Sequence, residues 1–291
     1  MHRSVFLKEL VDGLSLESGD TVVDATINGG GHAEEAGARI GPTGTLVGID
    51  LDRAALEAAK ERLQMIPCKK IFEEENFRNL ESVLAKHGIK EVDAVMFDLG
   101  LSSNQLEHSG RGFSFMRDEP LQMTFSASPE RTAADLVNQE SEEEIARTLF
   151  ELGEERNSRR IARAIVDARK KERILSSARL AAIIEKAAPR RGRIHPATKT
   201  FQALRIAVND ELRNVREGLQ AAHRVLGPKG RIGVITFHSL EDRIVKQFFK
   251  TLEGEGEGKI LTKKPIMPTR TESQENPKAR SAKLRFFENR S

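Results

Sequence analysis

The chain has 291 residues and a net charge of +3, and Cys68 is its only cysteine. This length allows one or two domains with a hydrophobic core, and a single cysteine excludes an intrachain disulfide. No apolar run reaches the roughly 18 residues of a membrane span, and Lys8, Glu9 and Asp12 interrupt the first residues in a way that excludes a signal peptide. We therefore expect a cytoplasmic protein without membrane contact.

Short β-branched or apolar runs alternate with helical stretches in the first hundred residues. The expected strands cover Thr21–Asp24, Thr45–Asp50, Lys69–Glu73 and Val92–Asp98, and the clearest expected helix covers Arg53–Met65. Strands that alternate with helices are typical of βαβ units, which form a parallel sheet.

The middle of the chain is helical in character, without a strong strand signal. Ser141 and Glu144 predict a capping box at the start of one helix. Regularly spaced apolar residues predict two further helices before Pro196, which itself suits the first turn of another. A block of helices therefore follows the fourth expected strand.

Basic charge is concentrated in this helical stretch. Residues 153–205 contain 15 Lys and Arg but only five Asp and Glu, whereas the whole chain has a net charge of only +3, so the remainder is acidic. A basic block on an acidic body is typical of a surface that binds a polyanion, although solvated helix faces would give the same composition.

Strand character returns near the end of the chain. Arg231–Phe237 is expected to form a strand, and a helix is expected to follow from Ser239, with Asp242 at the third position of a capping box. The segment Lys263–Lys278 is rich in Pro, Thr and Glu and is expected to be an exposed loop. Two terminal strands are expected at 259–262 and 281–287.

The simplest architecture is one α/β domain that is interrupted after its fourth strand by a helical insertion. We expect the α/β domain to comprise residues 1–104 and 206–291, and the basic helical insertion to comprise residues 105–205.

The sharpest motif is Asp24-Ala-Thr-Ile-Asn-Gly-Gly-Gly-His32, which begins at the end of the first strand. Three successive glycines let the backbone turn tightly and approach a ligand closely, and ligands of such sheets bind at the carboxyl ends of the strands. The dinucleotide fingerprint does not fit, because its glycines would fall at His32 or Glu34, and the Gly-Lys-Ser/Thr of a P-loop is absent. Asp50, which ends the second strand, can accept both hydroxyls of a ribose. A nucleoside without a diphosphate is therefore expected, such as S-adenosylmethionine, and an ordinary tight turn is the alternative.

Several longer segments occur in the order in which one known family carries them. They are Asp24–His32, Asp98–Ser103, Arg111–Arg117, His195–Gln202 and Thr236–Arg243. By these segments the chain resembles the ribosomal RNA small subunit methyltransferase H family, the bacterial 16S rRNA cytosine-N4 methyltransferases. The resemblance covers nearly the whole chain.

This resemblance implies a class I methyltransferase fold, which is a Rossmann-like, mostly parallel seven-stranded sheet with an inserted helical domain. It also implies S-adenosylmethionine as cofactor and a cytidine in the decoding region of 16S rRNA as methyl acceptor, in naked RNA or in the small ribosomal subunit. By position in the matched segments, the residues expected to contact the cofactor are Gly30, Gly31, His32, Asp50, Phe77, Asp98 and Gln105. The ring of Phe77 follows the third strand, where it could lie against adenine or belong to the core.

The chain departs from the family pattern at one place. After Pro-Leu the family usually has Asp-Met-Arg, whereas this chain has Gln122-Met123-Thr124. If the missing acid and base hold the target nucleotide or pair within the insertion, the departure affects activity or specificity.

Two side chains are candidates for the chemistry of methyl transfer. The reaction is a single in-line displacement, so alignment supplies much of the rate, and acceptors aimed at the amine protons stabilise the developing positive charge. Asp98 ends the fourth strand beside the expected methyl position, and it either positions and deprotonates the amine or only holds the cofactor. His238 follows the fifth strand, and it either acts as a base or only caps the next helix.

The inserted domain is expected to bind RNA phosphates and to contribute little sequence readout. The candidate residues are Arg159, Arg160, Arg163, Arg190, Arg191 and Lys199. Some arginines could instead pair with Glu154 and Glu155. No spaced His or Cys ligand set is present in the sequence, so no metal is expected. Methylation of DNA, protein or a small molecule, or a non-catalytic role in ribosome assembly, are the alternative functions.

Overall fold

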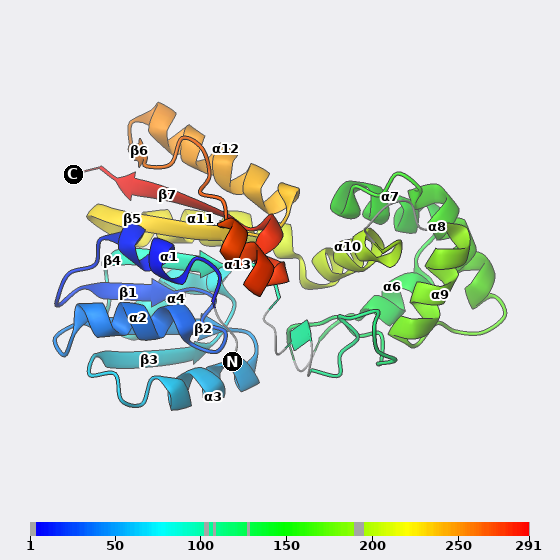
Figure 1. Cartoon of the computed structure of the whole chain (residues 1–291), viewed down its shortest axis with the longest axis horizontal. Helices are drawn as coiled ribbons and strands as arrows, with labels where there is room; N and C mark the ends of the chain where they lie inside the picture. Colours follow the sequence, from blue (N-terminus) through cyan, green and yellow to red (C-terminus); the bar gives the residue numbers. More distant parts are fainter. Residues whose placement is uncertain (1–3, 102–104, 107–108, 127–128, 189–194, 291) are drawn as a thin grey trace. The chain divides into compact units, whose positions relative to one another are not determined.

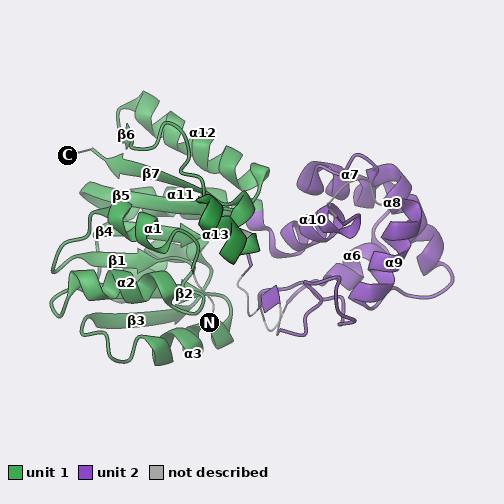
Figure 2. Cartoon of the chain, in the orientation of Figure 1, with its two compact units in different colours: residues 1–100, 212–291 green, residues 101–211 purple. Residues whose placement is uncertain are grey.

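The computed structural model describes residues 4–101, 105–106, 109–126, 129–188 and 195–290 (Figure 1). The chain forms two compact units, which are described separately below (Figure 2). Unit 1 comprises Met1–Gly100 and Leu212–Ser291, and unit 2 comprises Leu101–Glu211. No helix among the described residues combines the length and the apolar character that are needed to span a membrane.

Unit 1 contains a seven-stranded sheet with the order β3-β2-β1-β4-β5-β7-β6. The strands β1 to β5 are parallel, and β7 runs antiparallel to both β5 and β6. The strands are β1 (Thr21–Asp24), β2 (Thr45–Asp50), β3 (Lys69–Glu74), β4 (Val92–Asp98), β5 (Leu226–Thr236), β6 (Gly258–Ile260) and β7 (Lys283–Asn289). The expected mostly parallel seven-stranded sheet is confirmed.

Helices cover both faces of this sheet. The strand residues alternate between the two faces, so that Val23 packs in the core with α4, α11 and α12, and Val22 packs in the core with α1, α2 and α3. The helices are α1 (Leu7–Leu14), α2 (Gly31–Ile40), α3 (Arg53–Arg62), α4 (Leu80–Lys86), α11 (Glu211–Val225), α12 (Ser239–Glu255) and α13 (Arg270–Glu275), with 3-10 turns η1 (Phe77–Asn79) and η2 (Pro277–Ser281).

The strand order reverses direction at β1, which lies between β2 and β4. The chain leaves β1 for a helix and β2 on one side, and it later returns to β4 on the other side. This arrangement is a topological switch point, and ligands of such sheets bind there, beyond the carboxyl ends of the strands. Asp24 and Asp98 are the last residues of β1 and β4, so both carboxylates lie at this point.

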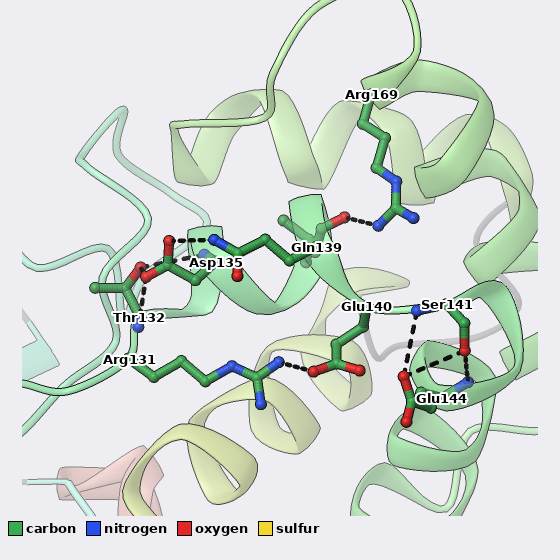
Figure 3. Close-up of polar contacts among 9 residues, drawn as sticks. Arg131, Thr132, Asp135, Gln139, Glu140, Ser141, Glu144 and Arg169 are labelled. Atoms are coloured by element: carbon green, nitrogen blue, oxygen red, sulfur yellow. Dashed lines mark hydrogen bonds and ion pairs between the residues drawn. The ribbon is translucent and has the colours of Figure 1, made fainter.

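Unit 2 is a helical unit with its own hydrophobic core. Its helices are α6 (Ala133–Gln139), α7 (Glu142–Gly153), α8 (Ser158–Arg169), α9 (Ser177–Ala187) and α10 (Ala197–Asn209). Figure 3 shows capping boxes at the starts of α6 and α7, in which Thr132 pairs with Asp135 and Ser141 pairs with Glu144. The second of these boxes was expected from the sequence.

Two expectations about local structure were wrong. The helix after β5 begins at Ser239 as expected, but its capping box pairs His238 with Glu241 and does not use Asp242. The segment expected to be an exposed loop contains α13, because the hydroxyl of Thr269 accepts the amide hydrogen of Glu272 and starts a helix. Glu272 also accepts the amide hydrogen of Phe6 at 2.8 Å, which ties α13 to the first residues of the chain.

Candidate cofactor and substrate site

The loop after β1 turns tightly because two of its residues adopt left-handed backbone conformations. Asn28 has φ 49°, and its amide donates to Asp50 Oδ2 at 2.9 Å. Gly30 has φ 76°, and a Cβ atom there would also lie 3.2 Å from the backbone of Ala59. A side chain at Gly30 would therefore add both backbone strain and crowding.

The other two glycines of the motif have different surroundings. A Cβ atom on Gly31, the first residue of α2, would lie 2.1 Å from the hydroxyl of Ser4. A Cβ atom on Gly29 would meet no described heavy atom within 4 Å. The backbone is therefore packed against the protein at Gly31 and open at Gly29, as expected for a loop that leaves room for a ligand.

A buried polar cluster lies where β1 and β4 end. His32 Nε2 lies 2.9 Å from the carbonyl oxygen of Val5, so this nitrogen carries the hydrogen and donates it. His32 Nδ1 faces Asp98, 3.7 Å from Oδ2. Burial lowers the pKa of His32, which favours the neutral ring. The imidazole thus presents an acceptor nitrogen to the Asp98 carboxyl group.

The two aspartates of this cluster are shifted toward the protonated form. Burial raises the pKa of Asp24 to about 7, although His32 and the amide of Thr26 oppose the shift. Burial and the nearby carboxylate of Glu241 raise the pKa of Asp98 to about 7. Asp98 Oδ1 is buried and has no hydrogen-bond partner among the described residues. An unpaired buried acceptor is costly, so this oxygen is suited to a donor or a cation that a ligand brings.

Asp50 is held by the backbone on two sides. Oδ2 accepts the amide hydrogen of Asn28 and Oδ1 accepts that of Asp52, each at 2.9 Å. Burial raises the pKa of Asp50 to about 6, and the two amide hydrogen bonds oppose this rise. Each carboxylate oxygen has a further lone pair, which can accept a ribose hydroxyl.

Phe77 lies at the edge of the core of unit 1. Its half-buried ring packs edge-to-face on Phe97, with centroids 5.6 Å apart. A Cβ atom on Gly218 of α11 would lie only 2.4 Å from this ring, so the glycine makes room for it. Gln105 belongs to unit 2, where it is buried and its carbonyl oxygen accepts the hydroxyl hydrogen of Ser109. Within unit 1 the structure thus brings the glycine loop, His32 and Asp98 together.

His238 is the N-cap residue of α12. Its Nδ1 accepts the amide hydrogen of Glu241, and the Glu241 carboxylate accepts the amide hydrogens of Phe237 and His238. His238 Nε2 lies 3.0 Å from Glu241 Oε1. The ring is therefore part of a capping box, and a role in catalysis stays a prediction.

Glu241 is a site residue that the sequence analysis missed. It is 1% exposed and is among the causes of the raised pKa of Asp98. The signal was the spacing of His238 and Glu241, which fits a capping box, but histidine is not among the residues usually preferred at an N-cap.

The predicted RNA-binding residues of unit 2 differ in their surroundings. Arg159 is exposed on α8. Arg160 Nε donates to the carbonyl oxygen of Ala187 at the end of α9, and Lys199 Nζ donates to that of Glu154 at 2.9 Å. Arg163 Nε donates to Glu142 at 3.3 Å. The last two predicted residues, Arg190 and Arg191, lie outside the described residues.

The departure from the family pattern is accommodated within unit 2. Gln122 is exposed, and Thr124 is buried with its hydroxyl donating to the carbonyl oxygen of Ser126 at 3.2 Å. The guanidinium group of Arg111 donates to the carbonyl oxygens of Thr124 and Phe125. The segment is thus held largely through its backbone.

A mostly parallel seven-stranded sheet, with a glycine bend and carboxylates at its switch point, defines a class I methyltransferase. Residues 1–290 match the family described as the MraW methylase family, and the chain belongs to this family. It is 46% identical over 293 residues to the ribosomal RNA small subunit methyltransferase H of Dictyoglomus thermophilum, and this match covers 100% of the chain and 97% of the relative. The proteins of the same name from Brevibacillus brevis and Clostridioides difficile are 42% and 40% identical over 99% of the chain, which covers 97% and 98% of them.

Among solved structures, the chain matches an rRNA methylase from Streptococcus thermophilus with 11% identity and a TM-score of 0.46. That match covers 100% of this chain and 99% of the solved chain. The family assignment rests on the sequence matches.

Proposed function

We propose that the protein transfers the methyl group of S-adenosylmethionine to the exocyclic N4 amine of a cytidine in 16S ribosomal RNA. The observation that carries this proposal is the 46% identity to a ribosomal RNA small subunit methyltransferase H over the full chain. The enzyme would act where small ribosomal subunits are assembled, in the cytoplasm.

Unit 1 would hold the cofactor. The open backbone at Gly29 and the unpaired oxygen of Asp98 fit a nucleoside ligand that carries a positive charge. Asp50 would bind the ribose hydroxyls, and Gly30 and Gly31 would let the loop approach the ligand closely. When bound, S-adenosylmethionine supplies an electrophilic methyl group. Phe77 and Gln105 are the remaining proposed contacts.

Asp98 would act on the amine of the target cytidine. The N4 lone pair is delocalised into the ring, so the amine becomes more nucleophilic as its hydrogens are held by an acceptor. The free lone pairs of Asp98 Oδ1 can accept one N4 hydrogen, and the carboxylate can take up the proton that N4 loses when the N–C bond forms. A pKa of about 7 lets this group accept and release a proton near neutral pH. His238 would orient the base or Glu241.

Unit 2 would bind the RNA backbone. Arg159 and Arg163 lie one helical turn apart on α8, and both are exposed. Such residues provide phosphate affinity that falls with salt concentration. Arg160, Arg190, Arg191 and Lys199 are the other proposed phosphate contacts.

Labelled S-adenosylmethionine tests this proposal directly. The purified protein would be incubated with naked 16S rRNA or with small subunits from a strain that lacks the enzyme, and the RNA would be digested to nucleosides. We expect label in N4-methylcytidine from at least one of the two substrates and none with Asp98→Ala. Label that appears only in another nucleoside, or only in added DNA or protein, would contradict the proposed acceptor.

A further inference from the structure

A stacked pair of rings lies in unit 2. The rings of Phe115 and His195 have centroids 4.3 Å apart and planes inclined by only 11°. Phe115 also packs edge-to-face on Phe201, whose ring is buried in the core of unit 2. The pair is therefore anchored to the core through Phe115.

Both nitrogens of the His195 ring are held in place. Nδ1 accepts the amide hydrogen of Ala197 at 3.2 Å. Since Nδ1 is an acceptor, Nε2 carries the hydrogen, and it donates to Glu185 Oε1 at 2.7 Å. The plane of the imidazole is thus fixed by two polar contacts at its edge as well as by the ring stacked against it.

Part of this ring stays accessible. The His195 side chain is 26% exposed, although Phe115 stacks on one face and both nitrogens have partners. The face opposite Phe115 is the ring face that no described aromatic ring covers. A flat ring that is held rigidly and open on one face can stack on another ring without losing conformational freedom on binding.

We propose that the exposed face of His195 is a stacking surface for an unpaired base of the RNA substrate. This inference rests on the proposed function. A target base that enters an enclosed site must leave its stack, so the bases next to it also lose a stacking partner. An aromatic ring can replace that partner, and the exposed arginines of α8 can hold the phosphates.

Fluorescence provides a specific test, because the chain contains no Trp and no Tyr. His195→Trp introduces the sole indole at the proposed surface. Phe150→Trp places one on α7, where the Phe150 side chain is 62% exposed, as the matched control.

The probes are an oligocytidylate of about 12 nucleotides, within the usual site size of single-strand binding proteins, and inorganic polyphosphate, which has the charge but no bases. We expect oligocytidylate to quench the indole of His195→Trp, and polyphosphate to leave it unchanged. The indole of Phe150→Trp should respond to neither probe.

Affinity measurements complete the test. We expect His195→Ala to weaken oligocytidylate binding roughly tenfold, and His195→Phe, which keeps a flat ring, to bind within about twofold of the wild type. The slope of log affinity against log salt should be the same for all three proteins, since no phosphate contact is lost. Thermal unfolding would show whether each variant is folded. If His195→Ala does not fold, His195→Phe and His195→Trp carry the test.

The stacking surface would be refuted if folded His195→Ala bound oligocytidylate like the wild type, or if polyphosphate quenched His195→Trp as strongly as the oligonucleotide. A wild-type protein that stacks a base but methylates no cytidine would instead contradict the proposed function. The two failures are therefore distinguishable.

Discussion

The acidic side chains at the switch point of unit 1 are buried, whereas basic side chains of unit 2 are exposed. Asp24 is 2% exposed and ends a central strand, and burial raises its pKa to about 7. Arg159 is exposed and lies on a helix whose apolar residues face the core of unit 2. A buried carboxylate lowers the stability of the fold, and its protonation state is sensitive to a single nearby charge. An exposed arginine has little effect on stability, and its interactions with other charges are screened by salt, so several arginines have to act together. Single substitutions should therefore have large effects in unit 1 and small effects in unit 2.

The largest effect is expected for Asp98→Asn, which keeps the shape of the side chain and removes the proposed proton acceptor. Methyl transfer should fall by roughly 10²- to 10⁴-fold, measured as N4-methylcytidine formed per minute at saturating cofactor. Glu57→Gln, on the exposed surface of α3, is the matched control and should leave the rate unchanged. If Asp98→Asn turned over at the normal rate, the expectation that single substitutions have larger effects in unit 1 than in unit 2 would be wrong.

The same variant should have a pH-dependent effect on stability. Burial raises the pKa of Asp98 in the folded protein to about 7, from an ordinary value of 3.8. The protonated carboxyl group is thus favoured by folding, and this contribution to stability is complete below about pH 4 and is lost as the pH rises to about 7. The melting temperature of cofactor-free Asp98→Asn should exceed that of the wild type by several degrees at pH 8, and the difference should disappear near pH 4. A difference that does not change with pH would contradict the assignment.

Asp50→Asn should weaken cofactor binding and leave the affinity for RNA unchanged. The substitution replaces one carboxylate oxygen of residue 50 by an NH₂ group, which cannot accept a hydrogen bond. Both oxygens of Asp50 accept backbone amide hydrogens and are proposed to accept ribose hydroxyls, so one of these hydrogen bonds is lost in either orientation of the amide. We expect the Kd for S-adenosylhomocysteine to rise roughly 10- to 100-fold, as for loss of a hydrogen bond to a charged group. Calorimetry would measure it. Asp52→Asn is the matched control, because asparagine can also cap α3.

A smaller effect is expected for Arg159→Ala in unit 2. Affinity for a 16S rRNA fragment should fall a few-fold, and the slope of log affinity against log salt should decrease by about 1, since one proposed phosphate contact is lost. The control is Lys60→Ala on α3 of unit 1, where Lys60 pairs with Glu57. If both variants bind alike at every salt concentration, the phosphate-binding surface does not include this part of α8.

The sheet and the glycine loop could be predicted because their signals are local. A β-branched run such as Thr21–Asp24 that ends in an acid, and three adjacent glycines, determine a strand and a tight turn without reference to distant residues. The capping box of Ser141 with Glu144 is equally local, and it was found.

Other features depend on residues that are distant in the sequence, and they were not predicted. The helix α13 is tied by Glu272 to the amide of Phe6, a contact across 266 positions. The Phe115–His195 stack joins residues 80 positions apart, and neither ring carries a periodic signal. The raised pKa of Asp98 depends on the burial of Asp98 itself and on the nearby carboxylate of Glu241, and both follow from packing in the folded protein.

The smallest expected effect concerns the capping boxes at the start of α6 and α7 (Figure 3). Ser141→Ala removes the oxygen that accepts the amide hydrogen of Glu144, so it should lower the unfolding free energy of unit 2 by about 1 kcal/mol. Ser141→Asp, which restores a capping acceptor, is the matched control and should recover most of the loss. Hydrogen exchange of the α7 amides would measure the change, because it reports the stability of each unit separately. Exchange in the strands of unit 1 and the affinity for S-adenosylhomocysteine should stay the same. Faster exchange in β1 or β4 of Ser141→Ala would show that the two units unfold together. The units would then differ in the surroundings of their charged side chains but not in stability.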